Sequence, residues 1–323
     1  MLSKVTLDKT TLAVSRLCFG TNMFGTAVDQ GRANALLDRF AELGGNFIDT
    51  ARSYGDWIAD APKGASERAV GAWLKTKRRD DIVVATKGAF FDIRAGDYQK
   101  RVTPVHLEQD LRESLEHLQI DTIDLYWLHM DDEAQPVGAI IDALIAHQQA
   151  GRIRYFGASN WSVARITEAQ GYARSIGHAG FVACQPFWGL AAPDRAMAAT
   201  SGYGNYYEDG YEALHAGGLT MIPYSAQSRG FFTKLATAGE AGLSDDLRDM
   251  YLNDTNRRRF AVLQQVAEER GAGLNDVALA YLTSQPVPTI PIIGASKPEQ
   301  IAESVAACDL TLSSEDLRRL RTA

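Results

Sequence analysis

Cysteine is scarce in this sequence, and its few cysteines form no recognisable pair. Cys18, Cys184 and Cys308 are an odd number, lie far apart and include no CxxC motif. This pattern does not indicate a disulfide framework, and it fits reduced thiols in a cytoplasmic protein. No close His/Cys cluster has the spacing of a zinc site, so we expect no metal and a cytoplasmic location.

Long apolar runs and basic clusters are also missing. No stretch of about 18 apolar residues occurs, and the N-terminus lacks the apolar segment of a secretory signal. The formal net charge is -7, and the longest basic run is Arg257–Arg259, which is typical of a solvated helix start. We therefore predict neither a membrane nor a nucleic-acid partner.

The common nucleotide-binding motifs are absent as well. The junction Phe19–Gly25, which follows the first apolar run, contains no GxGxxG fingerprint, and the chain has no GxxxxGK[ST] loop or HExxH helix. This argues against a doubly wound dinucleotide domain. A cofactor would have to bind in another way, or side chains would have to act alone.

What the sequence does contain is a regular alternation of eight apolar runs with amphipathic stretches. Apolar runs of this kind are typical of strands buried on both faces of a parallel sheet. They occupy residues 17–19, 46–48, 82–84, 123–128, 153–156, 181–183, 219–222 and 290–293. The 46% hydrophobic content fits one large α/β domain.

Eight such units predict a (β/α)8 TIM barrel that forms a single domain over residues 1–323. The segment Met1–Ser15 is expected to form an N-terminal β-hairpin that covers the bottom of the barrel. Two long loops, Gly189–Gly210 and Ser225–Asn253, are expected at the C-terminal rim, where long loops commonly cover a substrate or cofactor.

Four reactive side chains follow three successive runs and would share that rim: Asp49, Tyr54, Lys87 and His129. A tyrosine, with an ordinary pKa of about 10, donates a proton near neutral pH only if a positive charge stabilises its anion. Lys87 can supply that charge, and Asp49 can hold the lysine. Together with a hydrogen bond from His129, this set suits protonation of an oxygen that gains charge, as in hydride addition to a carbonyl.

At these residues the chain resembles the aldo-keto reductase superfamily. The stretch Phe47–Gly55 matches that family's Asp-Thr-Ala-x-x-Tyr-Gly signature, Ala85–Lys87 its lysine strand, and Asp124–His129 its histidine strand. The resemblance continues almost to the C-terminus. It implies a barrel enzyme that binds NADP(H) across the rim, with Tyr54 as the general acid or base.

The resemblance also implies cofactor-binding residues. Ser159, Asn160 and Gln185 match the residues that bind the nicotinamide carboxamide, and Tyr224 matches the aromatic residue that stacks on the ring. The pyrophosphate and adenosine ends are matched by Ser225, Gln227, Arg229, Gly294, Ser296, Lys297, Gln300 and Ser304. Because Lys297 is the one cation where relatives usually place an arginine, NADP(H) is expected and NAD(H) use stays open.

The substrate is less well defined by the sequence. Phe24, Trp57, Trp161 and Trp188 lie near predicted strand ends and are expected to line a pocket for a small carbonyl or sugar-like substrate. One alternative function is a sugar (aldose) dehydrogenase that works in the oxidative direction with the same residues. Another is a regulatory partner like the β-subunits of potassium channels, which is disfavoured because the predicted hairpin begins at Met1. The oligomeric state is not predicted.

Overall fold

The computed structural model describes residues 1–200, 202 and 205–323. Eight parallel strands form one sheet, whose order is β10-β3-β4-β5-β6-β7-β8-β9. Each strand lies near one of the eight apolar runs. Their bounds are β3 Cys18–Gly20, β4 Phe47–Asp49, β5 Val83–Gly88, β6 Ile123–Leu128, β7 Ile153–Ser159, β8 Ala183–Gln185, β9 Thr220–Met221 and β10 Ile292–Ile293.

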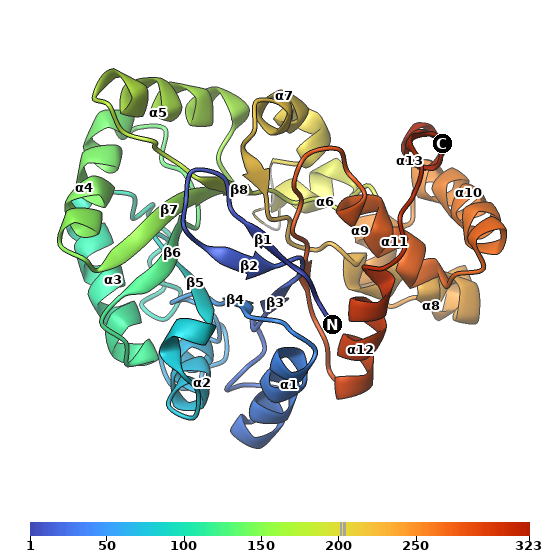
Figure 1. The fold of residues 1–323 in the computed structure, drawn as a ribbon, viewed down its shortest axis with the longest axis horizontal. Helices are drawn as coiled ribbons and strands as arrows, with labels where there is room; N and C mark the ends of the chain where they lie inside the picture. The colour runs from blue at the N-terminus through green and yellow to red at the C-terminus, as the bar shows by residue number, and fades with distance from the viewer. Residues whose placement is uncertain (201, 203–204) are drawn as a thin grey trace.

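The two ends of this sheet meet and close a barrel. The Ile290 backbone N–H donates to the Met221 carbonyl at 2.9 Å, and that of Ile292 donates to the Pro223 carbonyl at 2.9 Å. The prediction of a (β/α)8 barrel is confirmed (Figure 1). Closure places the carboxyl ends of all eight strands on one rim.

Helices follow the strands and form the outer ring seen in Figure 1. Their hydrophobic faces pack on the strands because Leu, Ile, Val and Phe recur at helical spacing. The longer ones are α1 Gln30–Glu42, α2 Ala65–Leu74, α3 Pro104–Leu118, α4 Val137–Gln149, α5 Val163–Ser175, α10 Asp254–Arg270, α11 Leu274–Thr283, α12 Pro298–Ala307 and α13 Ser314–Thr322.

The two long connections carry short helices of their own. Within residues 189–210, of which 201, 203 and 204 lie outside the described residues, the structure has α6 Arg195–Thr200 and the 3-10 turn η2 Tyr207–Asp209. The short helix α7, Tyr211–Ala216, comes next. Within residues 225–253 it has α8 Phe231–Ala238 and α9 Asp245–Tyr251, with η3 Ser228–Gly230 and η4 Glu240–Gly242.

The N-terminal hairpin is present as predicted. Strands β1, Lys4–Thr6, and β2, Ala13–Ser15, pair antiparallel and lie across the barrel in Figure 1. Leu7, Leu12 and Val14 pack with Phe47, Val83, Trp127 and other buried residues in one apolar cluster. The hairpin therefore closes the bottom of the barrel, and the opposite rim is left for polar side chains.

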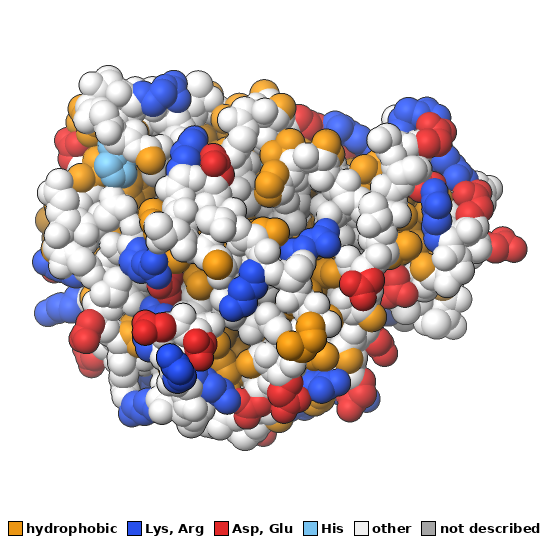
Figure 2. Space-filling view, in the orientation of Figure 1, with side chains coloured by type: hydrophobic (Ala, Val, Ile, Leu, Met, Phe, Trp, Pro, Cys, Tyr) orange, Lys and Arg blue, Asp and Glu red, His pale blue; other side chains and the backbone are white. Residues whose placement is uncertain are grey.

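No helix in the described part of the chain is long and apolar enough to cross a membrane. Acidic and basic side chains are interspersed on the face of the molecule drawn in Figure 2.

Candidate functional site

Alternation along three neighbouring strands brings the predicted catalytic residues together. Phe47, Ala85 and Trp127 belong to the apolar cluster inside the barrel. Side chains two residues apart on a strand point to the same side, so Asp49, Lys87 and His129 continue these three inward rows at the rim. The polar set therefore lies directly above an apolar interior.

A tight turn after β4 carries Tyr54. Its backbone N–H donates to the Ala51 carbonyl at 3.1 Å. The next residue, Gly55, has φ +96, and a Cβ there would lie 2.9 Å from the Ala65 Cβ. Only glycine suits this position, since L residues rarely adopt that backbone and no room exists for a side chain. Gly55 thus allows the turn to pack on α2.

Lys87 is the centre of the hydrogen-bonded set. Its Nζ forms an ion pair with Asp49 Oδ2 and donates to the Tyr54 hydroxyl oxygen at 3.0 Å. It also donates to the Thr50 carbonyl at 2.8 Å. The side chains of Lys87 and Asp49 are 1% and 3% exposed, so water does not screen the pair.

Charge around Lys87 keeps it ionised. Burial alone would lower its pKa, but the Asp49 carboxylate and the hydrogen bond to Tyr54 raise the pKa of Lys87 above its ordinary value. On the other side, Gln185 Nε2 donates to Asp49 Oδ1 at 3.0 Å. Each oxygen of the buried carboxylate therefore has a donor, as a buried charge requires.

His129 presents a neutral imidazole to the same place. Desolvation, together with the positive charges of Lys87 and Arg52, holds the pKa of His129 well below its ordinary value. Its Nδ1 is buried without a hydrogen-bond partner among the described residues. The ring instead packs edge-on to Tyr54, with centroids 5.9 Å apart, and against Phe90, with centroids 4.4 Å apart.

The residues predicted to hold the carboxamide lie beside this set. Asn160 Nδ2 donates to the His129 carbonyl at 2.9 Å, and the Tyr224 hydroxyl donates to Asn160 Oδ1 at 2.7 Å. Ser159 Oγ donates to the Gln185 carbonyl at 3.0 Å. The structure thus joins these three residues to the predicted catalytic set. Tyr224, predicted to stack on the nicotinamide ring, is joined to it through Asn160 and stacks on Phe187 with centroids 5.4 Å apart.

Several non-glycine residues at this rim, among them Ser228 and Arg229 in the loop after β9, have a left-handed backbone. Ala89, Asn160 and Ser225 have φ values of +62, +57 and +56, and they lie just after β5, β7 and near β9. Such conformations are unfavourable for most residues and concentrate at functional sites. Their positions agree with a site at this end of the barrel.

The residues predicted for the adenosine end form a second group. Gln227 Nε2 donates to Ser304 Oγ at 3.2 Å, and Gln227 Oε1 accepts from the Gly294 backbone N–H at 3.3 Å. Space is open around Gly294, where a Cβ would have no heavy atom within 4 Å. The chain can therefore be approached closely at this point.

The N-terminus of α12 completes that group. Gln300 Oε1 accepts from the backbone N–H groups of Ser296 and Lys297 at 2.7 and 3.1 Å. Arg32, from the first turn of α1, donates from Nε to the Ser296 carbonyl at 2.9 Å. Neither Arg32 nor Lys297 has an ion-pair partner in the described ranges, so two exposed cations flank one helix N-terminus.

The remaining predicted residues do not form one group. Arg229 is exposed and forms an ion pair with Asp246. Phe24, Trp161 and Trp188 are at most 2% exposed. Phe24 packs near Phe19, Trp161 Nε1 donates to the Met130 carbonyl at 3.0 Å, and Trp188 stacks on Tyr207 at 3.5 Å. Trp57 is 46% exposed, and its ring lies edge-on to that of Tyr54 with centroids 6.2 Å apart.

Sequence reasoning did not single out the aromatic residues after β5. The Phe90 ring packs on His129, and the ring centroids of Phe90 and Phe91 are 5.0 Å apart. Tyr98, which is 68% exposed, has its ring centroid 6.0 Å from that of Phe91. The sequence could have indicated them, because Phe90 and Phe91 come only three and four residues after Lys87, at the same end of the strand. A row of aromatic rings thus leads outward from His129.

Among residues 1–200, 202 and 205–323, no group of three or more His, Cys, Asp or Glu side chains could hold a metal ion. The chemistry of the described set is that of proton donors and hydrogen-bond partners.

Comparisons with known proteins agree with this geometry. The model of the Aldo/keto reductase family matches residues 16–323. A norsolorinic acid reductase of Aspergillus flavus is 30% identical, with 96% of this chain and 78% of that protein covered. A probable voltage-gated potassium channel subunit beta of Oryza sativa is also 30% identical, with 94% and 90% covered.

A solved structure gives the same result at the level of the fold. The holo form of an aldo-keto reductase from Bacillus halodurans has a TM-score of 0.75 and 25% identity, with 100% of this chain and 96% of that chain covered. Since the family model covers nearly the whole chain, this protein belongs to the aldo/keto reductase family of oxidoreductases.

Proposed function

We propose that this protein is an NADP(H)-dependent reductase that converts an aldehyde or ketone to an alcohol. The observation that carries the proposal is the hydrogen bond of 3.0 Å from Lys87 Nζ to the Tyr54 hydroxyl oxygen, inside a buried ion pair with Asp49. A lysine charge held in this place stabilises the tyrosinate that remains after a proton is given up. Tyr54 is therefore the general acid in our proposal.

The residues divide the reaction between them. NADPH, when bound, supplies the hydride that adds to the carbonyl carbon. The Tyr54 hydroxyl gives its proton to the carbonyl oxygen as that oxygen gains charge, and Lys87 stabilises the phenolate. Neutral His129 donates a hydrogen bond to the same oxygen and orients it. Because His129 is uncharged, it does not compete with Lys87 for the phenolate.

The described residues fit a nicotinamide dinucleotide. Ser159, Asn160 and Gln185 supply hydroxyl and amide groups beside the catalytic set, where a carboxamide would bind. At the other end, the α12 N-terminus with Lys297 and Arg32 offers N–H groups and positive charge for a phosphate. This arrangement supports NADP(H) over NAD(H).

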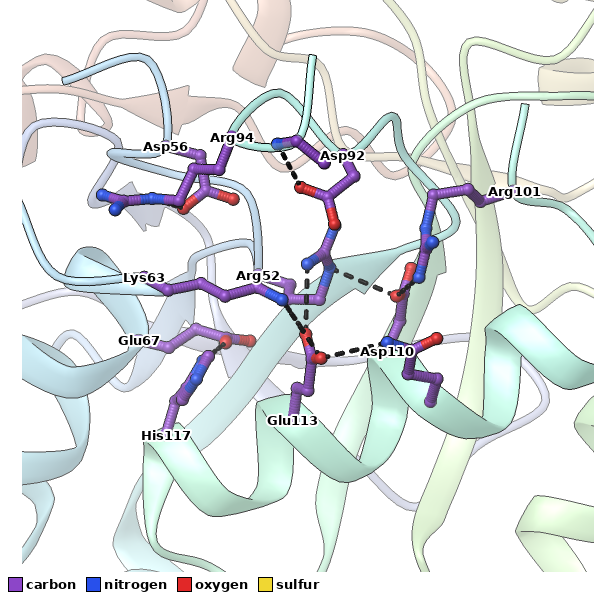
Figure 3. Close-up of polar contacts among 12 residues, drawn as sticks. Arg52, Asp56, Lys63, Glu67, Asp92, Arg94, Arg101, Asp110, Glu113 and His117 are labelled. Atoms are coloured by element: carbon purple, nitrogen blue, oxygen red, sulfur yellow. Dashed lines mark hydrogen bonds and ion pairs between the residues drawn. The ribbon is translucent and has the colours of Figure 1, made fainter. Parts of the chain in front are cut away.

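The aromatic row supports an apolar or aromatic carbonyl compound over a sugar. Trp57 lies edge-on to Tyr54, and Phe90, Phe91 and Tyr98 form the row of rings that leads outward from His129. Asp56, which could have bound a hydroxylated ligand, is buried and paired with Arg94 (Figure 3). Buried free thiols at Cys18, Cys184 and Cys308 are in keeping with a cytoplasmic enzyme.

The test is a panel of aromatic aldehydes, aliphatic ketones and aldoses, assayed at 340 nm with NADPH and with NADH in both directions. Reduction of aromatic aldehydes with NADPH is expected to be fastest. Faster NADP⁺-dependent oxidation of aldoses would favour the sugar dehydrogenase instead. Absence of turnover in every combination would refute both.

The likeness to the Oryza sativa channel subunit favours a second candidate function. In this candidate the protein is a slow, redox-sensing partner of another protein and keeps the same four residues, Asp49, Tyr54, Lys87 and His129. Such a protein would bind NADPH but complete few turnovers per hour. Turnover faster than about one per second, the ordinary range for enzymes, would exclude this candidate.

A further inference from the structure

A buried group of charges beside the catalytic set has no role in the proposed reaction. Arg52, two residues before Tyr54, has a side chain that is 0% exposed. It points toward α3 and lies among carboxylates there (Figure 3). Its Nη1 forms an ion pair with Glu113 at 3.1 Å, and its Nε lies 3.4 Å from Asp110 Oδ1. Placing these charges away from water is costly, so the arrangement calls for an explanation.

The partners of Arg52 hold the chain just after β5. Asp110 Oδ2 accepts from the Ala89 backbone N–H at 2.8 Å, while Arg101 contributes a second ion pair to the same carboxylate at 2.7 Å. Arg52 Nη2 donates to the Phe91 carbonyl at 3.5 Å, and the Arg52 backbone N–H donates to the Lys87 carbonyl at 3.0 Å. Since Ala89 has φ +62, this segment needs such contacts to keep its conformation.

The segment Ala89–Phe91 carries the ring that packs on His129. Because His129 Nδ1 has no hydrogen-bond partner among the described residues, packing against Phe90 and Tyr54 sets the orientation of the imidazole. A shift of the Phe90 backbone would therefore change one of the two ring contacts that position His129.

We propose that Arg52 is a positioning residue for His129: through Asp110 and the main chain of Ala89–Phe91, it holds the Phe90 ring against the imidazole. This inference rests on the proposed reductase function. It adds that a residue without contact to substrate or cofactor sets the alignment of the hydrogen bond from His129. A displacement of about 1 Å from such a change can cost up to about 10²-fold in rate.

The experiment uses Arg52→Met in the full-length protein, with 4-nitrobenzaldehyde and NADPH as probes. The expected result is a fall in kcat of about 10- to 100-fold, with the NADPH dissociation constant, measured by fluorescence, within about twofold of wild type. In protein labelled with ¹⁵N-histidine, the His129 ring signals are expected to move while those of His215 stay in place.

A matched control is available at the opposite end of β5. Arg79 pairs with Asp124 at 2.6 Å, and Asp124 Oδ2 accepts from the Val84 backbone N–H at 2.9 Å, as Asp110 does from Ala89. Arg79→Met removes an arginine with the same kind of carboxylate contact, although its side chain is 33% exposed, at the end of β5 away from His129, so kcat and the His129 signals should stay near wild type. Equal losses in Arg79→Met and Arg52→Met would show general destabilisation and overturn the proposal.

A double-mutant cycle tests the route. In a Phe90→Leu background, adding Arg52→Met should lower kcat by less than about threefold, since the ring through which Arg52 acts is already gone. Additive losses would contradict that route. If Arg52→Met does not fold, Arg52→Lys is the second variant. It keeps a positive charge beside Asp110 and Glu113 but lacks the guanidinium group that contacts both carboxylates. It should fold and show the same loss in kcat; wild-type kcat would overturn the proposal.

One further variant separates this inference from the proposed function. If His129→Ala leaves kcat unchanged, the catalytic assignment of His129 fails. If His129→Ala is slow while Arg52→Met is not, only the role of Arg52 fails.

Discussion

Gln185 and Lys87 hold the two oxygens of one buried carboxylate, Asp49. Gln185 Nε2 donates to Oδ1 at 3.0 Å, and Lys87 Nζ forms an ion pair with Oδ2. The residue proposed to bind the carboxamide thus also supports Lys87, the lysine of the proposed catalytic set. In Gln185→Leu, we expect weaker NADPH binding and a loss of about 1–3 kcal/mol in the free energy of unfolding, because Oδ1 loses its donor.

Fluorescence titration and urea denaturation measure these two effects. Gln170→Leu is a suitable control for stability, since Gln170, on the outer helix α5, forms two hydrogen bonds with the backbone of Phe181. A Gln185→Leu protein with wild-type NADPH affinity would remove Gln185 from the cofactor site.

Tyr54→Phe tests the proton donor. The ring and its packing on His129 are kept, and only the hydroxyl that Lys87 contacts is lost. We expect carbonyl reduction to fall about 10²- to 10⁴-fold, with NADPH affinity near wild type. Tyr172→Phe, on helix α5, removes a hydroxyl bonded to Asp142 and should retain full activity. Near-full turnover by Tyr54→Phe would end the assignment of Tyr54 as general acid.

Lys87→Met leaves the Asp49 carboxylate buried without its ion-pair partner. Breaking a buried pair costs about 3–5 kcal/mol, so urea denaturation should show a large loss of stability as well as lost activity. Adding Asp49→Asn removes the unpaired charge and should restore part of the stability but none of the activity. Lys77→Met, whose partner Asp38 is on the surface, should cost less than about 1 kcal/mol. Wild-type stability in Lys87→Met would contradict the buried ion pair.

Cofactor preference depends on two exposed cations in our proposal. We expect NADPH to bind about ten- to thirty-fold more tightly than NADH, or roughly 1–2 kcal/mol, with the ratio falling as salt rises. Lys297→Ala and Arg32→Ala should each reduce the ratio. Arg39→Ala, on the same helix as Arg32 but paired with Glu42, should leave it unchanged. Equal binding of both cofactors by the wild type would show that the 2′-phosphate is not recognised here.

Stability should fall as the pH drops below about 6.5. Burial lowers the pKa of His215, whose Nδ1 lies 2.8 Å from the Tyr207 hydroxyl. The unfolded chain takes up a proton near pH 6.5 while the folded one does not, so the free energy of unfolding decreases below that pH and is unaffected above it.

Urea denaturation at pH 7.5, 6.5 and 5.5 measures this slope. His129, His147 and His178 have pKa values lowered in the same direction, so the diagnostic quantity is the difference between wild type and His215→Gln. The variant should show the shallower slope. Identical slopes would mean that His215 does not contribute.

The barrel could be predicted because its strands are buried on both faces and leave uninterrupted apolar runs. The strand bounds shift by a few residues; the sixth run, 181–183, became β8 at Ala183–Gln185. Asp49, Lys87 and His129 could be found because each continues an inward-facing row of a strand, which is a local property of the sequence.

Contacts between distant helices could not be predicted in this way. Arg32 reaches Ser296 only because α1 and α12 pack together, and no local sequence pattern predicts this contact. The interpretation of Arg257–Arg259 as a solvated helix start was wrong for Arg259. That residue is 3% exposed and donates from Nη1 to the Leu190 carbonyl at 2.9 Å, since it lies on the inner face of α10.

Closure of the barrel has a consequence for synthesis. Strand β3 begins at Cys18, but its outer partner β10 begins at Ile292, so one edge of the first barrel strand stays unpaired until almost the whole chain has left the ribosome. At about 5–20 residues per second, that interval is on the order of tens of seconds. An unpaired edge invites association with other chains. Truncation before β10 would make the exposure permanent, and aggregation rather than a smaller soluble enzyme is the expected product.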